Sequence, residues 1–289
     1  MKRDTVGLSE SVESHRPREH YRISPEPPSL RDDVRELLRF RDLFLLLLGR
    51  ELRVRYKQTA LGVLWVVLQP LAPAIIFAVV LGQFARLPSS GTPYLLFALS
   101  GLVIFGLFSG AVLRGSGSLV RDSQLVTRVY FPRAVLPLAA GSAAFLDFVV
   151  GFALVVTIMI GLGYPPSVTL LAVPVIALFT GCLGLAFGMA LSALTARFRD
   201  FSHAVPFFLQ VLLYGSPVVY SQELLPASVS GIYALNPLVA LIEAFRWSLG
   251  GTPPPEPSQL LAGSITGVVV VVLAITIFSR ASRDVADVI

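Results

Sequence analysis

Residues 134–196 read AVLPLAAGSAAFLDFVVGFALVVTIMIGLGYPPSVTLLAVPVIALFTGCLGLAFGMALSALTA and contain one formal charge, at Asp147. A helix needs about 20 apolar residues to cross the roughly 30 Å core of a bilayer, so this 63-residue segment is too long for one crossing. Residues 163–167, Gly-Tyr-Pro-Pro-Ser, lie near its middle and are typical of a turn. The segment therefore predicts two membrane-spanning helices, over about 134–162 and 168–195.

Four more segments without a formal charge are long enough for a membrane helix. They predict spans over about 61–81, 94–113, 201–222 and 257–279. The sequence thus predicts an all-α integral membrane protein with six transmembrane helices. Gly184 and Gly188, four residues apart, have the spacing of a small-residue face on which another helix can pack closely.

The composition excludes several classes of protein. Of the 289 residues, 54% are hydrophobic and 14% are charged, about half the charged share of a soluble domain. Thirteen of the 23 Lys and Arg and ten of the 18 Asp and Glu lie in the first 57 residues. The rest of the chain is too apolar for a soluble globular protein, a disordered chain or a nucleic-acid binder, and its mean hydropathy of +0.74 agrees.

Arginines in the short loops predict the orientation, because cytoplasmic loops carry the excess of Lys and Arg. With a cytoplasmic N-terminus, eight arginines lie inside: Arg114, Arg121, Arg128, Arg133, Arg197, Arg199, Arg280 and Arg283. Only Arg86 and Arg246 then lie outside. The sequence therefore predicts a multi-pass protein of the plasma (inner) membrane with both termini in the cytoplasm.

The chain before the first span divides into two parts. Residues 1–28 are polar and end in prolines, which predicts a disordered cytoplasmic tail. Residues 29–57 carry leucines at helical spacing among charges, which favours an amphipathic helix on the cytoplasmic membrane surface. The alternative is a soluble helix that binds a partner. The six-span transmembrane domain then covers 58–289.

An apolar segment over 232–249 lies between the fifth and sixth predicted spans. A seventh span here would put the C-terminal arginines outside, against the charge rule, and would contain Glu243 and Arg246. Asn236-Pro237 favours a break. We therefore expect a pair of external re-entrant helices before the last span, at membrane depth where protein or a water-filled cavity surrounds them.

The longest cytoplasmic loop runs from about Arg114 to Arg133. Leu119, Leu125 and Val129 can form the apolar side of a short helix, with arginines elsewhere. Any basic inner loop contacts anionic lipid headgroups, but the mixed apolar and polar character of this one favours docking of a cytosolic protein.

Several kinds of chemistry have no residues to support them. No Gly-x-x-x-x-Gly-Lys-Ser/Thr loop is present, so the chain is not a P-loop ATPase. Three histidines and one cysteine give no metal-ligand spacing, and no paired acids after the N-terminal region offer a catalytic site. Asp147 is the one acid inside a predicted span, too few for a typical ion-coupled transporter. It is a functional switch or a structural hydrogen-bonding group.

Several short motifs follow one another over residues 40–285: Arg50-Glu51-Leu52; Arg55-Tyr56-Lys57-Gln58-Thr59-Ala60-Leu61-Gly62 with Trp65; Leu125-Val126-x-Arg128 with Tyr130-Phe131-Pro132-Arg133 and Leu136-Pro137; Arg197-Phe198-Arg199-Asp200; and Asn236-Pro237-Leu238 with Phe245-Arg246. Their order and spacing resemble type-2 ABC exporter permeases for lipid-linked polysaccharides, which are O-antigen, capsule and teichoic acid. The tail before residue 28 departs from that family's pattern.

The resemblance implies a homodimer of this permease with a channel between the copies, driven by two copies of a separate P-loop ABC ATPase. ATP and Mg²⁺ would bind to the ATPase, so we expect no cofactor, metal or catalytic residue in this chain. Besides the second copy and the ATPase, its expected partners are membrane lipids and the polysaccharide substrate. The ATPase-coupling loop would contain Arg121, Asp122, Ser123, Gln124, Leu125 and Arg128. The external re-entrant segment would contain Asn236, Pro237, Glu243 and Arg246.

The substrate implied is a lipid-linked polysaccharide, with O-antigen first and teichoic acid or capsule as alternatives. Two alternative functions belong to other classes of protein. One is a secondary transporter or channel, and the other is a membrane-embedded enzyme that acts on a lipid-linked sugar. Sugars offer apolar C–H faces to aromatic rings and hydroxyls to exchangeable hydrogen-bond partners. Candidate channel-lining residues near the outer or middle parts of the second and fifth spans are therefore Phe105, Phe108, Tyr214, Ser216 and Tyr220.

Overall fold

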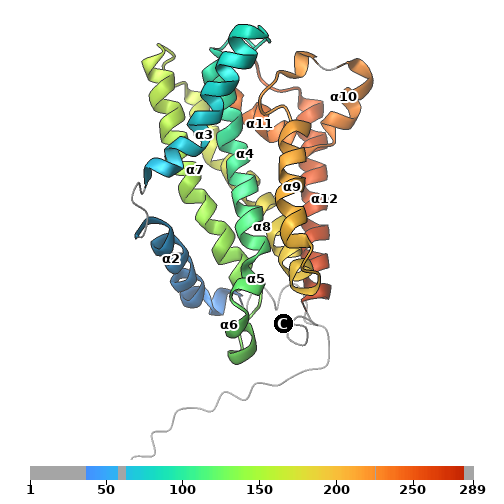
Figure 1. The fold of residues 1–289 in the computed structure, drawn as a ribbon. Coiled ribbons are helices and arrows are strands. Elements are labelled where there is room, and N and C mark those ends of the chain that lie inside the picture. Colours follow the sequence, from blue (N-terminus) through green and yellow to red (C-terminus); the bar gives the residue numbers. More distant parts are fainter. Residues whose placement is uncertain (1–36, 58–62, 225, 283–289) are drawn as a thin grey trace, which may run out of the picture.

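The computed structural model describes residues 37–57, 63–224 and 226–282, and every regular element in these ranges is helical (Figure 1). The predicted tail over 1–28 and the predicted start of the amphipathic helix at residue 29 lie outside the described residues. The all-helical fold class is confirmed for the part of the chain that the structure describes.

Among the described residues, five helices are long and apolar enough to cross a membrane. They are α3 with the π-helix η1 (Val63–Phe77 and Ala78–Phe84), α4 (Tyr94–Ser116), α7 (Val135–Gly161), the 3-10 helix η2 with α8 (Val168–Ala172 and Val173–Arg197), and α12 (Pro257–Ala281). The chain is thus a multi-span membrane protein, and the turn predicted near residues 163–167 separates α7 from η2.

The helix in the predicted fifth span is shorter than expected. Helix α9 covers Phe201–Gly215, 15 residues, which is about 22 Å at 1.5 Å per residue. It ends because Pro217 follows Ser216, and a residue before proline is driven out of the helical conformation. Ser216 is accordingly extended, with φ −116° and ψ 153°. The six-span layout therefore stays a prediction.

The remaining helices lie at the two ends of the bundle (Figure 1). At one end, which we call the loop end, lie α5 (Ser118–Arg121), α6 (Ser123–Arg128) and the obliquely placed α2 (Arg41–Lys57). At the opposite end, the α11 end, lie α10 (Ala227–Ala234) and α11 (Pro237–Ser248). The short 3-10 helix η3 covers Gln222–Leu224.

Helix α4 forms the centre of the bundle and packs mainly on α7 and α8. Small residues allow this close packing, as the spacing of Gly184 and Gly188 predicted. A Cβ atom on Gly184 would lie 2.8 Å from the Phe108 carbonyl oxygen, and one on Gly188 would lie 2.9 Å from the Ala111 carbonyl oxygen. Larger residues at these two positions would push α8 away from α4.

The apolar segment over 232–249 is two helices and not one span. Helix α10 ends at Ala234, and Asn236 caps α11 by accepting a hydrogen bond from the Leu238 backbone N–H at 3.0 Å. Pro237 occupies the first turn of α11, where it is favoured because its missing N–H has no helical partner there. The predicted break at Asn236-Pro237 is confirmed.

Candidate functional site

A groove runs along one side of α4, between α3, α9 and α7, with a cavity volume of about 580 Å³. Its wall is mostly apolar, with a few polar side chains placed along it. The polar and charged groups that line it are Gln69, Ser109, Arg114, Asp147 and Gln210. A largely apolar hollow with few polar groups is the usual form of a binding site.

Asp147 forms an ion pair with Arg114, from the last turn of α4. The two side chains are 20% and 19% exposed and both line the groove. Gly110 lies one turn before Arg114, and a Cβ atom there would lie 3.5 Å from Arg114 Nη1. The pairing offsets the cost of holding each charge at membrane depth. Of the two roles that the sequence allows for Asp147, a functional switch or a structural group, this ion pair favours the structural one.

The two predicted lining residues on α4 differ in what they contact. Phe105 lines the groove, although its side chain is largely buried. Phe108 is 1% exposed and lies behind the groove wall, tilted against Phe105 and edge-on to Phe187 at ring-centroid distances of 6.3 and 5.9 Å. Phe105 is therefore a wall residue of the groove, and Phe108 is a core residue that supports it.

The other three predicted lining residues lie at the end of α9 and in the segment after it. Tyr214 is 55% exposed. Ser216 is buried and accepts a hydrogen bond from Asn236 Nδ2 at 3.1 Å. The Tyr220 hydroxyl donates to the Tyr214 carbonyl oxygen at 3.0 Å and also pairs with the Tyr233 hydroxyl. These contacts join the end of α9 to α10 and to the cap of α11. Tyr214 is the most exposed of the three, and none of the three lines the groove.

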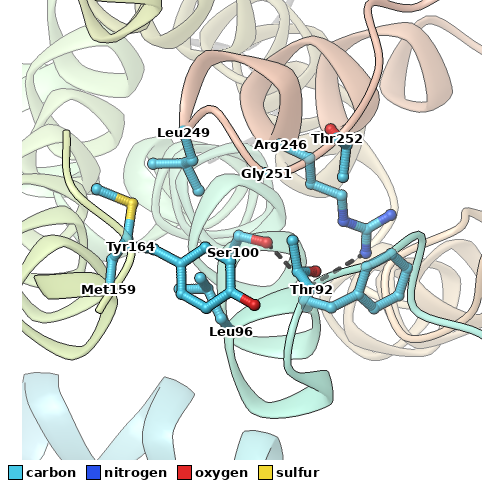
Figure 2. Close-up of a pocket in the computed structure, with 10 residues that line it drawn as sticks. Thr92, Leu96, Ser100, Met159, Tyr164, Arg246, Leu249, Gly251 and Thr252 are labelled. Carbon is cyan, nitrogen blue, oxygen red and sulfur yellow. Dashed lines mark hydrogen bonds between the residues drawn. The ribbon is translucent and has the colours of Figure 1, made fainter. Parts of the chain in front are cut away.

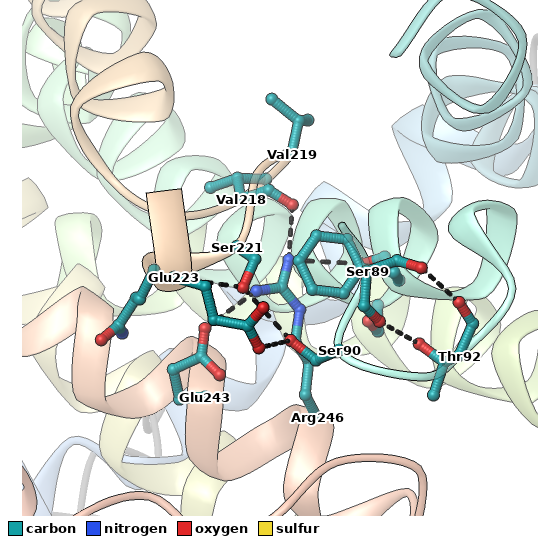
Figure 3. A network of polar contacts seen from close by, with 12 residues as sticks. Ser89, Ser90, Thr92, Val218, Val219, Ser221, Glu223, Glu243 and Arg246 are labelled. Carbon is teal, nitrogen blue, oxygen red and sulfur yellow. Dashed lines mark hydrogen bonds and ion pairs between the residues drawn. The ribbon is translucent and has the colours of Figure 1, made fainter. Parts of the chain in front are cut away.

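Arg246 is the centre of a polar network at the α11 end (Figure 3). Its side chain is 2% exposed, and its guanidinium donates to Glu243 Oε1 at 3.0 Å, to the Val218 carbonyl oxygen at 2.7 Å and to the Phe97 carbonyl oxygen at 3.3 Å. The network thus joins α11 to α4 and to the segment after α9. Sequence reasoning placed Arg246 and Glu243 in the external segment but did not predict that Arg246 is buried.

The space beside Arg246 is too small for a ligand. Residues of α4, α7 and α11 line it together with Thr92 and Thr252, as Figure 2 shows, and its volume is about 10 Å³. That volume is at most the space of a single water molecule. The network around Arg246 is therefore an internal anchor and not a binding site.

The predicted coupling loop consists of two short helices, not one. Asp122 separates α5 from α6 with a non-helical backbone, φ −105° and ψ 30°. Leu119 is fully buried and Leu125 is half-buried, but Val129 is extended and 53% exposed. The expectation that Val129 shares a helical apolar face with Leu119 and Leu125 is wrong, because the helix breaks at Asp122 and ends at Arg128.

The six predicted coupling residues divide by exposure. Arg121, Gln124 and Arg128 are exposed, and together with Thr127 they form the open surface of the loop. Asp122, Ser123 and Leu125 are partly buried. The exposed group is the part of the loop that can contact a partner.

Four charged side chains join this loop to α2. Arg50 Nη2 donates to Asp122 Oδ2 at 2.8 Å, and Arg121 Nη2 donates to Glu51 Oε1 at 2.7 Å. Two longer contacts, Arg50 to Glu51 at 3.4 Å and Arg121 to Asp122 at 3.7 Å, connect the four side chains into one ion network. Sequence reasoning missed this ion network. Arg50 and Glu51 belong to a sequence motif, and nothing in the sequence links them to residues about 70 positions later.

The described residues hold no group of three or more His, Cys, Asp and Glu side chains that could bind a metal ion.

Comparison with known proteins gives one family and two kinds of relative. Residues 42–249 match the family described as ABC-2 type transporter. The chain is 28% identical over 256 residues to an O-antigen export system permease protein RfbA of Myxococcus xanthus, covering 88% of this chain and 98% of the relative. It is 27% identical over 252 residues to an RfbA protein of Klebsiella pneumoniae, covering 86% and 95%. It is 24% identical over 202 residues to a polysialic acid transport protein KpsM of Escherichia coli, covering 68% and 77%.

Proposed function

Because the chain belongs to the ABC-2 type transporter family, we propose that it exports a lipid-linked polysaccharide, O-antigen first, across the plasma membrane. It is the permease chain of such a system: it lacks an ATPase site, binds no cofactor itself and works with a separate ATPase subunit. Beyond the family, we propose the substrate, the assembly and the orientation of the chain in the membrane.

The extent of similarity supports O-antigen over capsule. The matches to the O-antigen export permeases cover 95–98% of those proteins, whereas the match to the polysialic acid transport protein covers 77%. Identity is also higher for the first group. Capsule export is therefore the second candidate, and teichoic acid export has no such similarity in its favour.

The groove is the single observation that carries the transport proposal. It is open along one side of the protomer, so a second copy facing it would enclose a channel. Phe105 offers a ring to the apolar face of a sugar, while Gln69, Ser109 and Gln210 offer exchangeable hydrogen bonds to its hydroxyls. We propose a homodimer served by two ATPase subunits, with the groove of each copy forming half of the channel.

The proposed topology has six spans and both termini in the cytoplasm. Helix α9 and the segment to residue 222 would form the fifth crossing. The loop end then faces the cytoplasm, where the exposed surface of α5 and α6 docks on the ATPase. Helices α10 and α11 form the external re-entrant pair.

Transport by a reconstituted complex tests the proposal. The chain would be purified with its P-loop partner, placed in vesicles, and supplied with labelled lipid-linked O-antigen and ATP. We expect export that requires ATP and that stops when the P-loop lysine of the partner is replaced. Transport driven by an ion gradient without the partner would instead indicate a secondary transporter. Turnover of the sugar lipid by the purified chain alone would indicate an enzyme.

The identity of the polymer needs its own comparison. O-antigen and a capsular polymer on matched lipid carriers would be offered to the same vesicles. Faster export of the capsular polymer would overturn the choice of O-antigen while leaving the export function intact.

A further inference from the structure

The ion network of Arg50, Glu51, Arg121 and Asp122 is placed at the contact between α2 and the α5–α6 loop. Its two acids are the least exposed members, with 11% of the Asp122 side chain and 18% of the Glu51 side chain accessible. Each acid accepts a short hydrogen bond from an arginine of the other element. The hydrogen bond from Arg50 to Asp122 also raises the pKa of the Arg50 guanidinium. Networks of partly buried, hydrogen-bonded charges hold their geometry better than single exposed pairs do.

An apolar contact supports the same connection. Leu47 on α2 and Leu119 on α5 are both buried, and they belong to one cluster with Val135 of α7 and Phe278 of α12. Asp122 lies at the junction of α5 and α6. Its backbone dihedral angles are not helical, but its N–H donates to the Ser118 carbonyl oxygen and its carbonyl oxygen accepts from the Leu125 N–H. The ion network adds side-chain links between this junction and α2.

Helix α2 leads directly to one wall of the groove. It ends at Lys57, and α3 begins at Val63, with only residues 58–62 between them. Five residues span at most about 18 Å, so α2 cannot move far without affecting the start of α3. Helix α3 supplies Val66, Gln69 and Pro70 to the groove.

The walls of the groove differ in how firmly they are held. In the apolar window of α4, 72% of the residues are buried, against 11% in the segment of α3 and η1. Packed interiors resist gradual deformation, so α4 cannot shift without rearranging its contacts with α7 and α8. Elements with few buried contacts move at lower cost. Helix α9 is held no more firmly, since Val205 and Leu209 are its buried residues. Of the walls beside α4, α3 and α9 are therefore the ones that move at least cost.

We propose that Arg50, Glu51, Arg121 and Asp122 are positioning residues that make α2 and the α5–α6 loop move as one body, so that displacement of the loop changes the position of α3 and the width of the groove. The proposal rests on the proposed function, because the ATPase is what displaces the loop. It adds a route from loop to groove that does not pass through the rigid α4.

Charge substitutions test this role in the reconstituted complex. Arg50→Gln and Asp122→Asn each remove a charge from the less exposed of the two short links between the loop and α2. We expect each to raise the ATP hydrolysed per polymer exported about threefold or more, in the range of coupling energies between contacting groups. Arg53→Gln is the matched control, since Arg53 is one turn further along α2, is exposed, and donates only to the Gly49 carbonyl oxygen at 3.1 Å. It should leave the ratio unchanged.

Exchanging the two charges distinguishes loss of the ion network from a general loss of folding. The double variant Arg50→Asp with Asp122→Arg puts both acids on α2 and both arginines on the loop, so the attraction between the two elements is kept. It should restore the ratio of hydrolysis to export. If the single variants keep the normal ratio, or if the exchange variant is as uncoupled as they are, the proposal is wrong.

A distance measurement tests the joint without relying on export. In a Cys182→Ser background, spin labels at Leu46 on α2 and Val129 after α6 should keep one separation with and without ATP. Labels at Leu64 on α3 and Phe208 on α9 should change separation. In Arg50→Gln the first separation should become broad and the second should stop responding. If the distance between the labels at Leu46 and Val129 changes with ATP while the ion network is intact, α2 and the loop do not move as one body. This conclusion holds even if the complex exports a different substrate.

Discussion

The guanidinium carbon of Arg246 lies 3.6 Å from the centroid of the Phe97 ring, and the same guanidinium donates to the Phe97 carbonyl oxygen. Arg246 is on α11 and Phe97 is in the first turn of α4, so one side chain joins α11 to the central helix of the bundle. A buried cation is costly unless its hydrogen bonds are made. Here Glu243 and two carbonyl oxygens accept from the two terminal nitrogens and the guanidinium packs on the ring, while the buried Nε has no hydrogen-bond partner among the described residues.

Removing this cation should destabilise the protein strongly. Arg246→Met leaves Glu243 and two carbonyl oxygens without their donor, and loss of one partner of a buried charge pair costs about 3–5 kcal/mol. Arg246→Lys keeps the charge but lacks the planar set of donors, so we expect an intermediate loss. The melting temperature of the purified complex measures both. A Lys variant as stable as the original protein would show that the charge alone is enough.

Gly101 should tolerate no side chain, for a related reason. A Cβ atom there would meet the Val218 carbonyl oxygen and would lie 2.8 Å from Arg246 Nη2. Gly101→Ala should therefore lower the free energy of unfolding by about 1–3 kcal/mol, the usual cost of overpacking. Gly106→Ala is the control on the same helix, because its Cβ atom would meet nothing within 4 Å. Equal melting temperatures for the two variants would contradict this account.

The sequence predicted the spans well because charge and apolar length are local properties. Charges lie near both ends of α12, near the end of α4 and just before the start of α7. The turn at residues 163–167 marks the end of α7, and Asn236-Pro237 marks the break before α11. The length of α9 was overestimated because the apolar residues continue past Ser216, although Pro217 signalled the end of the helix. Reading proline as a helix terminator at that position would have corrected the boundary.

The sites were less predictable, because they depend on pairings between distant residues. Arg50 meets Asp122 across 72 positions and Arg246 meets Phe97 across 149. No periodicity connects such residues. The burial of Phe108 behind Phe105 is of the same kind, since two aromatic residues three apart on a helix give no signal of which one faces the groove.

The ion pair of Arg114 and Asp147 should behave as a coupled unit. Asp147→Asn leaves the arginine charge at membrane depth, and Arg114→Gln leaves the acid there. Each should cost about 1–3 kcal/mol, less than a fully buried pair because both side chains keep a fifth of their exposure. The double variant should cost less than the sum of the two, as a double-mutant cycle on melting temperatures can show. Strict additivity would mean that the two groups do not stabilise each other.

Labelling from outside the cell tests the orientation. In the Cys182→Ser background, a cysteine at Ile232, which is 72% exposed on α10, should react with a membrane-impermeant maleimide in intact cells. A cysteine at exposed Gln124 on α6 should react only after lysis. A reporter fused to the C-terminus should be active in the cytoplasm. Activity of that reporter outside would overturn the predicted topology and would require another crossing between α9 and the end of α12.

Alanine at the aromatic candidates should separate wall residues from core residues. Tyr214 is 55% exposed, so Tyr214→Ala should leave the melting temperature unchanged while slowing export of labelled polymer at a normal rate of ATP hydrolysis. Phe108 is 1% exposed and contacts Phe105 and Phe187, so Phe108→Ala should cost about 3–5 kcal/mol of stability through the cavity it leaves. Phe105→Ala should do both, since Phe105 is largely buried and also lines the groove. Neither Tyr214 nor exposed Phe207 on α9 lines the groove, so Phe207→Ala is the control for a general effect of removing an exposed ring from this helix. Normal export by both Tyr214→Ala and Phe105→Ala would place the path of the polymer away from these rings.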